Sequence, residues 1–228
     1  MKTVDLISNL LKHRESSVKQ LLQSEVEFKS LLHMFLLSLC LYSLYGFIIG
    51  YSQNVLQAIS SALKLPVLFY LCTLICFPTL YFFLSFLGVK QNFKQILAFM
   101  VFCNTFISFV LTAFAPVSFF FLITSYQYTL FKLINLIIFS VAGLTGIYLF
   151  YREIYGIILE LKAHFGYQKQ KKGILFLRLW AIMYAIIGLQ LSFTLSPFFG
   201  LPNTPFILFT NEKSNFFIDI LNTIYHVF

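Results

Sequence analysis

The 228-residue chain is 59% hydrophobic and 11% charged, whereas a soluble domain is typically about 45–50% apolar and about 25% charged. That composition leaves too little polar surface for a water-soluble globule. It therefore predicts a protein that crosses a membrane several times and argues against a soluble enzyme or a disordered chain. The formal net charge is +8, but the Lys and Arg residues are scattered between apolar runs and do not form the basic domain of a nucleic-acid-binding protein.

Residues 1–29 precede the first long apolar run and are expected to form a cytoplasmic amphipathic helix. Apolar side chains recur there at near-helical spacing, opposite a charged face. Such a helix either lies on the membrane surface or packs against a partner protein. The apolar positions are Val4, Ile7, Leu11, Val18 and Leu22.

Residues 30–200 contain five stretches that are long and apolar enough to cross a membrane. A helix needs about 20 apolar residues to traverse a hydrocarbon layer of about 30 Å. The sequence therefore predicts an all-α fold, a polytopic bundle of five transmembrane helices with an amphipathic helix at each terminus. The predicted spans are 31–50, 65–88, 96–115, 128–151 and 179–197.

Three features beside these spans have their own predictions. Residues 51–64 are expected to form a separate, short interfacial helix before the second span. Pro116 is expected to end the third span, and the apolar residues 117–125 that follow are too few to cross. Trp180 is expected at the membrane interface, where tryptophan is enriched.

The distribution of basic residues predicts the orientation. With five spans, 13 of the 16 Lys and Arg residues fall on the side of the amino terminus, and only Lys64, Lys132 and Lys213 fall on the other. Cytoplasmic loops carry an excess of Lys and Arg. We therefore expect a multi-pass protein of the cell inner membrane, with a cytoplasmic amino terminus and an external carboxyl terminus.

The loop after the fourth span begins with apolar residues that continue the helical pattern, until Gly166 and the run 169–173 are expected to break the helix. Lys169, Lys171 and Lys172 lie in that run. They either bind acidic lipid headgroups, at about 1 kcal/mol per basic residue near the surface, or belong to an ordinary solvated loop.

Residues 201–228 are expected to form an external tail. Prolines and a glycine between residues 197 and 205 exclude a continuous helix. Ser214 is a candidate N-cap for a final amphipathic helix that runs to Val227. That helix is expected to lie on the outer face of the bilayer, to cap the ends of the spans or to dock onto another protein.

Catalytic and metal-binding motifs are not evident. The predicted spans hold no Asp, Glu or Arg near their middles, although pumps and proton-coupled transporters generally need such groups. Cys72 and Cys76 are one helical turn apart, but no His or carboxylate stands nearby to complete a zinc site. We therefore expect a non-enzymatic protein without a cofactor or a metal.

The amide and hydroxyl groups inside the spans have two interpretations. They hold the bundle together through interhelical hydrogen bonds, or they line a polar cavity for a small solute or a lipid headgroup. Pro78 favours the cavity, because a proline in mid-span frees a carbonyl and kinks the helix. The candidate cavity residues are Asn104, Asn135, Gln190, Tyr126 and Lys132.

Two groups of small residues predict close approach between helices. Gly46 and Gly50 are four residues apart in the first span, and Ala181, Ala185 and Gly188 form a strip in the fifth. The contacts lie either within one chain or between copies.

The stretch Ser61-Ala-Leu-Lys-Leu-Pro66 with Phe77-Pro-Thr-Leu-Tyr81, and the segment 180–200 followed by Pro205-Phe, resemble an uncharacterised group of bacterial polytopic membrane proteins. Some members of that group are labelled as containing an actin-binding WH2 domain. More weakly, Gly88 before Gln-Asn-Phe-Lys94, together with five spans, resembles the Yip1-type membrane domain, which is associated with membrane trafficking or organisation. Both resemblances imply a polytopic membrane fold, and neither transfers a functional residue.

These observations favour an accessory or scaffolding subunit of a larger membrane assembly. The alternative is a small channel or carrier that uses the polar cavity, and an enzyme acting on lipid is the least favoured function. The expected partners are the lipid bilayer and either a second membrane protein or further copies of this chain. Nucleic acid is not expected as a partner.

Overall fold

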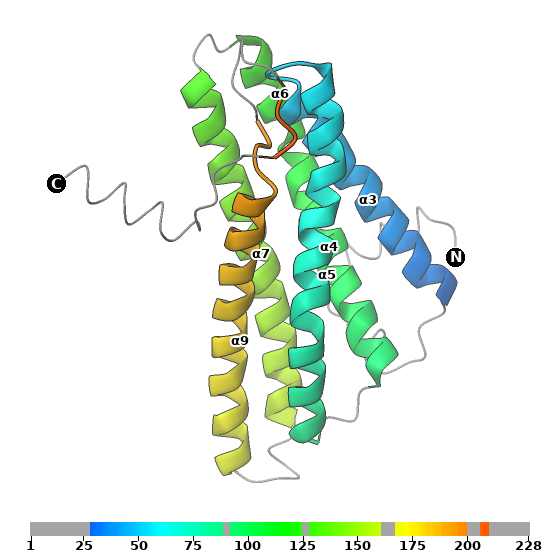
Figure 1. Ribbon diagram of the computed structural model, residues 1–228. Coiled ribbons are helices and arrows are strands. Elements are labelled where there is room, and N and C mark those ends of the chain that lie inside the picture. Colours follow the sequence, from blue (N-terminus) through cyan, green and yellow to red (C-terminus); the bar gives the residue numbers. More distant parts are fainter. Residues whose placement is uncertain (1–27, 89–91, 125–127, 161–166, 200–205, 210–228) are drawn as a thin grey trace, which may run out of the picture.

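The computed structural model describes residues 28–88, 92–124, 128–160, 167–199 and 206–209 (Figure 1). Within these ranges the regular structure is entirely helical, with no strand. The helices are α3 (Phe28–Gly50), α4 (Val55–Phe86), α5 (Phe93–Ala113), α6 (Ala115–Thr124), α7 (Tyr128–Glu160) and α9 (Tyr167–Thr194).

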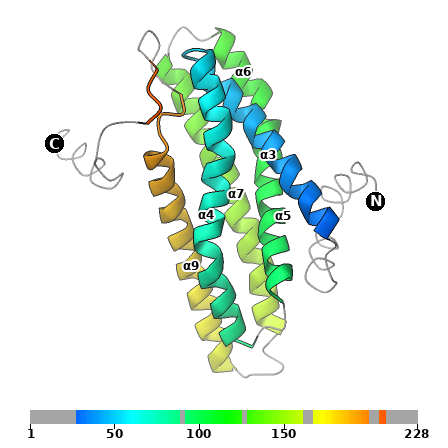
Figure 2. The same cartoon turned by 45° about the vertical axis from the view of Figure 1, so that its right-hand side comes forward.

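The helices form an elongated bundle in which α4, α5, α7 and α9 run side by side and α3 crosses α4 and α5 obliquely (Figure 1, Figure 2). α3 packs on α4 and α5, whereas α9 packs on α4 and α7. We call the end where α3 ends and α4 begins the Lys64 end. The opposite end, where α4 ends and α5 begins, is the Gly88 end.

Five helices are long and apolar enough to cross a membrane, in agreement with the predicted number. The third of them is the nearly continuous run of α5 and α6, which has 32 residues from Phe93 to Thr124. Large apolar side chains, among them Leu74, Phe82 and Leu144, are exposed on the outside of the bundle. Soluble monomers rarely expose apolar patches of that extent, so the outer surface suits a hydrocarbon environment.

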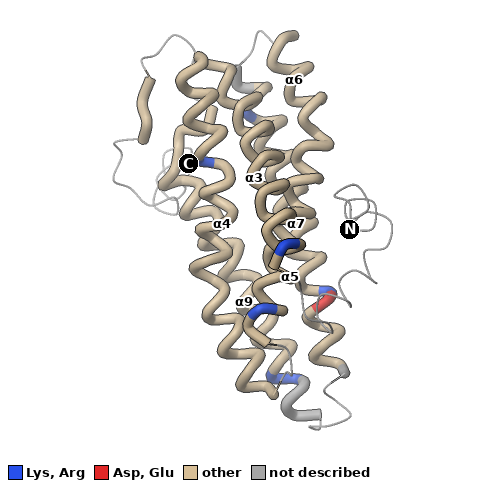
Figure 3. The backbone as a smooth tube through the Cα atoms, turned by 90° about the vertical axis from the view of Figure 1, so that its right-hand side faces the viewer, with Lys and Arg blue, Asp and Glu red and all other residues tan. Residues whose placement is uncertain are grey.

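Basic side chains concentrate in the half of the bundle toward the Gly88 end, where Figure 3 shows most of the charged segments. The exposed cations of that half are Lys29, Lys94, Arg152, Lys171, Lys172 and Arg178. Toward the Lys64 end, the described ranges hold only Lys64 and Lys132. A positive-inside orientation requires an asymmetry of this kind.

Capping groups mark the turns on either side of α4. The side chain of Asn54 accepts a 2.8 Å hydrogen bond from the backbone N–H of Gln57, which satisfies one of the donors that a helix start leaves free. After α4, Gly88 has a φ of 83°, a left-handed conformation that glycine adopts without strain. The backbone N–H of Asn92 then donates to Gln95 Oε1 at 2.8 Å where α5 begins.

α4 differs from the predicted second span because it begins at Val55 and not at residue 65. The stretch predicted as a separate interfacial helix is therefore the first part of α4, and Pro66 lies in the helix interior. The prediction kept Lys64 outside the span as a charged residue. In the structure Lys64 lies inside the helix and is buried against backbone carbonyls.

Pro116 interrupts the third helix but does not end the helical run. α5 ends at Ala113, Phe114 forms a turn and α6 follows at once. A proline has no N–H to donate to the preceding turn, yet the N–H of Ser118 bonds to the Phe114 carbonyl at 3.1 Å and resumes the ladder. The apolar residues after Pro116 thus lengthen the third helix, which the sequence did not predict. They do not form a crossing of their own, in agreement with the prediction.

α7 continues to Glu160, in agreement with the apolar pattern beyond the fourth span. The predicted break at residues 169–173 is wrong, because α9 is helical from Tyr167 onward. Gly173 is buried there, and a Cβ at this position would lie 3.1 Å from Leu87 Cδ1 and 3.2 Å from Ile158 Cγ2. The helix therefore continues through Gly173 despite the poor helix propensity of glycine, which costs about 1 kcal/mol, and the small residue fits the close contact with Leu87 and Ile158.

The core consists of two hydrophobic clusters, one in each half of the bundle. The cluster toward the Gly88 end includes Cys76, Leu80, Phe99, Leu149, Ile154 and Trp180. The cluster toward the Lys64 end includes Tyr42, Tyr45, Leu65, Leu111, Ala142 and Phe198.

Trp180 is a core residue, and its predicted interfacial position is wrong. Its side chain is 4% exposed, and its ring stacks on that of Phe150 with 4.5 Å between the centroids. Its Nε1–H donates to the backbone carbonyl of Cys76 at 3.2 Å. A buried indole N–H needs such an acceptor, and α4 supplies it.

Both predicted terminal amphipathic helices fall outside the described residues. Of the segment 1–29, the structure describes only Phe28 and Lys29, which begin α3. The predicted helix at 214–227 lies beyond the last described residue, Phe209.

Candidate functional site

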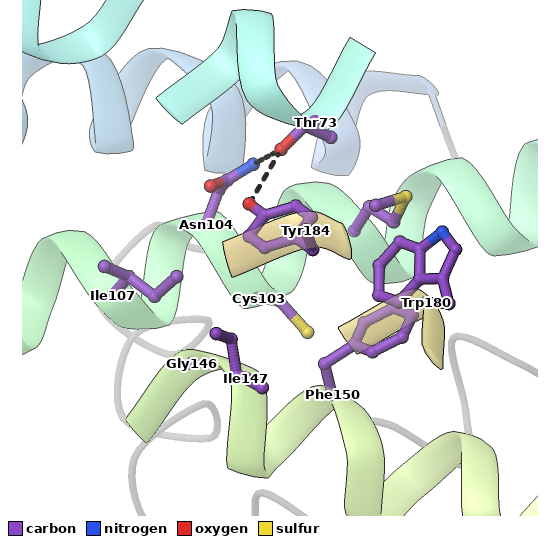
Figure 4. Close-up of a pocket in the computed structure, with 10 residues that line it drawn as sticks. Thr73, Cys103, Asn104, Ile107, Gly146, Ile147, Phe150, Trp180 and Tyr184 are labelled. Atoms are coloured by element: carbon purple, nitrogen blue, oxygen red, sulfur yellow. Dashed lines mark hydrogen bonds between the residues drawn. The ribbon is translucent and has the colours of Figure 1, made fainter. Parts of the chain in front are cut away.

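A first polar layer in the middle of the bundle joins α3, α4, α5 and α9. We call it the Asn104 layer, and its members are Tyr42, Thr73, Asn104 and Tyr184. Asn104 Nδ2 donates to Thr73 Oγ1 at 2.7 Å, and the Tyr42 hydroxyl donates to the Asn104 backbone carbonyl at 2.8 Å. The Tyr184 hydroxyl lies 3.5 Å from Thr73 Oγ1 (Figure 4). The layer thus ties four helices together.

Asn104 also borders a small cavity of about 20 Å³, whose other walls include Ile107, Gly146 and Phe150 (Figure 4). The Asn104 side chain is 2% exposed, and its Oδ1 has no hydrogen-bond partner among the described residues. A polar cavity needs about 10–15 Å³ to hold one water molecule. The space beside Asn104 therefore suits a single water and is too small for an organic solute.

We expect Thr73→Val to destabilise the bundle more than Asn104→Leu. The first change leaves Asn104 Nδ2 buried without its acceptor, at a cost of about 1–3 kcal/mol. The second change removes that donor together with the unpartnered Oδ1, so the lost hydrogen bond is partly offset by the removal of a buried polar atom that has no partner. Titration with a denaturing detergent, followed by circular dichroism, measures both. Thr145→Val at an exposed position on α7 is the control, and equal losses at positions 73 and 104 would argue against this pairing.

A second polar layer lies nearer the Lys64 end and joins α3, α6 and α7. We call it the Asn135 layer, and its members are Tyr45, Ser118 and Asn135. Asn135 Oδ1 accepts hydrogen bonds from the Tyr45 and Ser118 hydroxyls, each at 2.8 Å. Asn135 Nδ2 donates to the Phe131 carbonyl at 2.9 Å. All three side chains are buried, so the amide serves as the shared acceptor at a three-helix contact.

The five residues predicted to line one cavity do not come together in the described part of the chain. Asn104 and Asn135 belong to two layers that have no member in common. The Lys132 side chain is exposed on α7, and Gln190 is half-buried on α9 without bordering the Asn104 cavity. Tyr126 lies outside the described residues. The hydrogen-bonding interpretation therefore describes Asn104 and Asn135 better than the shared-cavity interpretation does.

A third polar group lies at the Lys64 end and was not predicted. Four side chains, from α4 and from the turn before it, donate to backbone carbonyls of the chain that follows α9. Ser52 donates to Phe199 at 2.8 Å, Gln57 to Pro197 at 2.7 Å and Ser61 to Phe198 at 2.5 Å. Lys64 donates to Pro197 at 3.3 Å and also to Leu208. We call Ser52, Gln57, Ser61 and Lys64 the carbonyl cradle.

The sequence holds a signal for the carbonyl cradle. Gln57, Ser61 and Lys64 are spaced by four and three residues, so they share one face of any helix that includes them. All three lie within the predicted interfacial helix 51–64, which therefore already places them on one face. Their acceptors are backbone carbonyls of residues that follow α9, so the stripe alone indicates no partner.

The predicted lipid-headgroup lysines lie in the first turns of α9. Lys171 and Lys172 are exposed, whereas the side chain of Lys169 lies outside the described part. Binding of acidic lipid headgroups by these lysines stays a prediction.

Gly46 and Gly50 pack against the backbone of α4 in the same chain. A Cβ at either position would lie 2.5 Å from a backbone carbonyl oxygen, that of Ser61 or that of Gln57. The strip in α9 is less tight, since a Cβ at Gly188 would meet Cys72 Sγ at 3.8 Å, and Ala181 and Ala185 are half-buried.

A wider, open depression of about 620 Å³ lies between the end of α3 and α6. Its walls are mainly apolar, and its hydroxyl groups come from Tyr51 and Ser52. Ser52 already donates to the carbonyls of Ile49 and Phe199. The depression does not contain any of the predicted cavity residues.

No three His, Cys, Asp or Glu side chains in the described ranges come close enough together to hold a metal ion. Cys72, Cys76 and Cys103 are buried free thiols, whereas Cys40 is exposed. Comparisons with protein-family models, with curated proteins and with solved structures found no match. The class of protein therefore rests on the helices themselves: the described chain is all-helical, with five helices compatible with a multi-pass membrane protein.

Proposed function

We propose that this chain is a non-enzymatic, multi-pass protein of the cell inner membrane that acts as an accessory or scaffolding subunit of a larger assembly. The exposure of α9 carries this proposal. In its most apolar stretch 11% of the residues are buried, compared with 28% to 39% in the other four candidate spans. α9 is therefore the candidate span least enclosed by the rest of the described bundle, which leaves a side open to a neighbouring transmembrane helix.

The exposed face of α9 is also regular. Its exposed Leu and Ile side chains are separated by four and three residues in turn, a spacing that lets one helix pack along another. The residues are Leu175, Leu179, Ile182, Ile186 and Leu189. Association of helices in lipid depends on such close side-chain packing, because burial of apolar surface adds little there.

The bundle interior also favours a subunit that binds other membrane proteins over a channel or carrier that transports a solute. Asn104 and Asn135 take part in hydrogen bonds between helices, and the cavity at Asn104 has the volume of about one water. The alternative function, a small channel or carrier, needs polar groups that continue from one end to the other, and these two layers do not share a residue.

The proposed orientation has the Gly88 end in the cytoplasm, because the exposed basic residues of the described bundle concentrate there. The amino terminus is then cytoplasmic and the carboxyl terminus external. Labelling of single cysteines introduced at exposed positions at each end, with a membrane-impermeant reagent, tests this orientation.

We expect the variant Leu179→Ala/Ile182→Ala/Ile186→Ala to lose a partner that co-purifies with the unmodified full chain in mild detergent. Removal of the branched side chains removes the packing surface without placing a charge in the membrane. The matched control is Leu133→Ala/Ile137→Ala/Leu144→Ala, which changes exposed residues of the same kind on α7. Mass analysis of the co-purifying chains and the size of the complex are the measurements.

Two results would overturn the subunit proposal. One is purification of the unmodified chain alone and as a single copy. The other is flux of potassium or glycerol through liposomes that contain only this chain, provided that Asn104→Leu abolishes the flux. Loss of the partner from the α7 control and not from the α9 variant would move the interface to α7.

A further inference from the structure

Lys64 is the buried cation of the described bundle. Its side chain is 6% exposed, whereas every other described Lys or Arg side chain is exposed. It lies on a continuous helix and not in a loop. An ionisable residue within a transmembrane helix is costly and usually has a specific partner, so the surroundings of Lys64 indicate what it does.

A centred α4 places Lys64 within the hydrocarbon layer. α4 has 32 residues, which corresponds to about 48 Å of helix against a hydrocarbon layer of about 30 Å. A centred α4 would extend about 9 Å beyond the layer at each end, whereas Lys64 lies about 14 Å along the helix from Val55.

The outer surface of α4 supports the same depth. Its exposed large side chains from the helix start to one turn past Lys64 are all apolar, and each is between 49% and 65% exposed. These residues are Val55, Leu56, Ile59, Leu63 and Val67. Such an apolar surface, which runs from the start of α4 to one turn past Lys64, fits acyl chains better than water.

Lys64 holds a short, irregular segment at this depth. Residues 206–209, which we call the strap, lie beside the bundle near the Lys64 end (Figure 1). Lys64 Nζ donates to the carbonyl of Leu208 and lies 4.8 Å from the centroid of the Phe209 ring. The strap side chains Phe206, Ile207, Leu208 and Phe209 are all apolar and are 36% to 50% exposed.

We infer that the strap is a re-entrant segment whose apolar side chains contact the acyl chains of the leaflet at the Lys64 end, and that Lys64 pins it there. Irregular backbone in hydrocarbon persists only when its polar groups have partners inside the protein. The ammonium group supplies donors to Leu208 and Pro197, and the Phe209 ring adds a cation–π contact. This inference rests on the proposed membrane placement.

The depth of the strap is measured with a nitroxide label at Ile207→Cys in the full chain, with Cys40→Ser to remove the exposed native thiol. The protein is reconstituted into vesicles of phosphatidylcholine and phosphatidylglycerol. Oxygen concentrates in hydrocarbon and a nickel chelate in water, so the ratio of the two collision rates reports depth. We expect oxygen to dominate at position 207. A dominant nickel signal at 207 would overturn the inference.

A label at Leu144→Cys, exposed in the middle of α7, separates this inference from the membrane placement. Nickel dominance at both positions would contradict the membrane placement itself. Oxygen dominance at 144 with nickel dominance at 207 would leave the placement intact and overturn the strap inference alone.

The role of Lys64 is tested by adding Lys64→Met or Lys64→Arg to the Ile207→Cys chain. We expect Lys64→Met to reverse the ratio at position 207 in favour of nickel, and Lys64→Arg to retain oxygen dominance, because arginine keeps the charge and the donors. The label at 144 is expected to remain in lipid in both. An unchanged ratio at 207 in Lys64→Met would show that Lys64 does not pin the strap. If Lys64→Met fails to fold, Lys64→Gln replaces it, because it also removes the charge and the cation–π contact; the same reversal is expected, and an unchanged ratio at 207 would again show that Lys64 does not pin the strap.

Discussion

Gly46→Leu is expected to force α3 away from α4 and to cost the folded bundle about 3 kcal/mol or more. A Cβ at position 46 would lie 2.5 Å from the carbonyl oxygen of Ser61 and 2.9 Å from Cα of Ala62. Both are backbone atoms, which do not move aside as the end of a flexible side chain does. The helices must separate, and the stacked rings of Tyr42 and Phe69, 4.4 Å apart, must separate with them. Denaturation of the purified protein in mild detergent measures the loss.

Gly143→Leu is the matched control, because a Cβ at Gly143 on α7 would have no neighbouring atom within 4 Å. Leucine is a better helix former than glycine, so this change is expected to leave stability unchanged or to raise it by up to about 1 kcal/mol. Equal losses at positions 46 and 143 would contradict the close approach of α3 to α4.

Asn135→Leu is expected to cost about 2 kcal/mol, because it leaves two buried hydroxyl donors without the acceptor that they share. The donors are Tyr45 and Ser118, on helices α3 and α6. The Tyr45 and Ser118 oxygens are 3.1 Å apart, so the two hydroxyls can still form a hydrogen bond with each other, which limits the loss of stability. Denaturant titration in detergent gives the free energy of unfolding.

The double variant Tyr45→Phe/Asn135→Leu distinguishes a specific hydrogen bond from a general loss of packing. We expect it to lose less stability than the sum of its two single variants, because residues that share a hydrogen bond couple. Ser140→Ala changes a hydroxyl that bonds only within its own helix at an exposed site, and we expect it to have little effect. Strictly additive losses at positions 45 and 135 would mean that Asn135 does not act through Tyr45.

The two polar layers and the carbonyl cradle have one physical feature in common. Each satisfies polar groups with partners from other parts of the same chain, at places where water is scarce. The Asn104 layer joins four helices, the Asn135 layer joins three, and the cradle holds the residues after α9 against the start of α4. The interior therefore supports the proposed subunit role, in which the outer face of α9 interacts with other molecules.

Composition and local pattern were sufficient for the coarse fold. The number of helices long enough to span a membrane follows from the apolar runs alone, because each run must be about 20 residues long to cross. The extension of α7 to Glu160 could also be read from its apolar spacing. The errors at Lys64 and at residues 169–173 have a different origin. A charge and a glycine both favour the end of a helix in local pattern, but Lys64 and Gly173 are each buried by a segment distant in sequence.

The candidate site could be predicted only in part for the same reason. Asn104 and Asn135 stand out in the sequence as amides within apolar runs, since such groups must find partners in lipid. Their partners Thr73 and Tyr45 are 31 and 90 residues away, and local spacing contains no information about contacts of that range. The cradle is harder still, because its acceptors are backbone carbonyls, which every residue has.

The amino-acid sequence by itself determined that this chain is an all-helical protein with five helices long enough for a membrane, because the length and hydrophobicity of a spanning helix are local properties. Only the tertiary structure decided that Trp180 is a core residue, that the amides form two separate layers and that Lys64 lies inside α4. Those outcomes depend on which helix each side chain contacts, and the packing of the whole bundle determines these contacts.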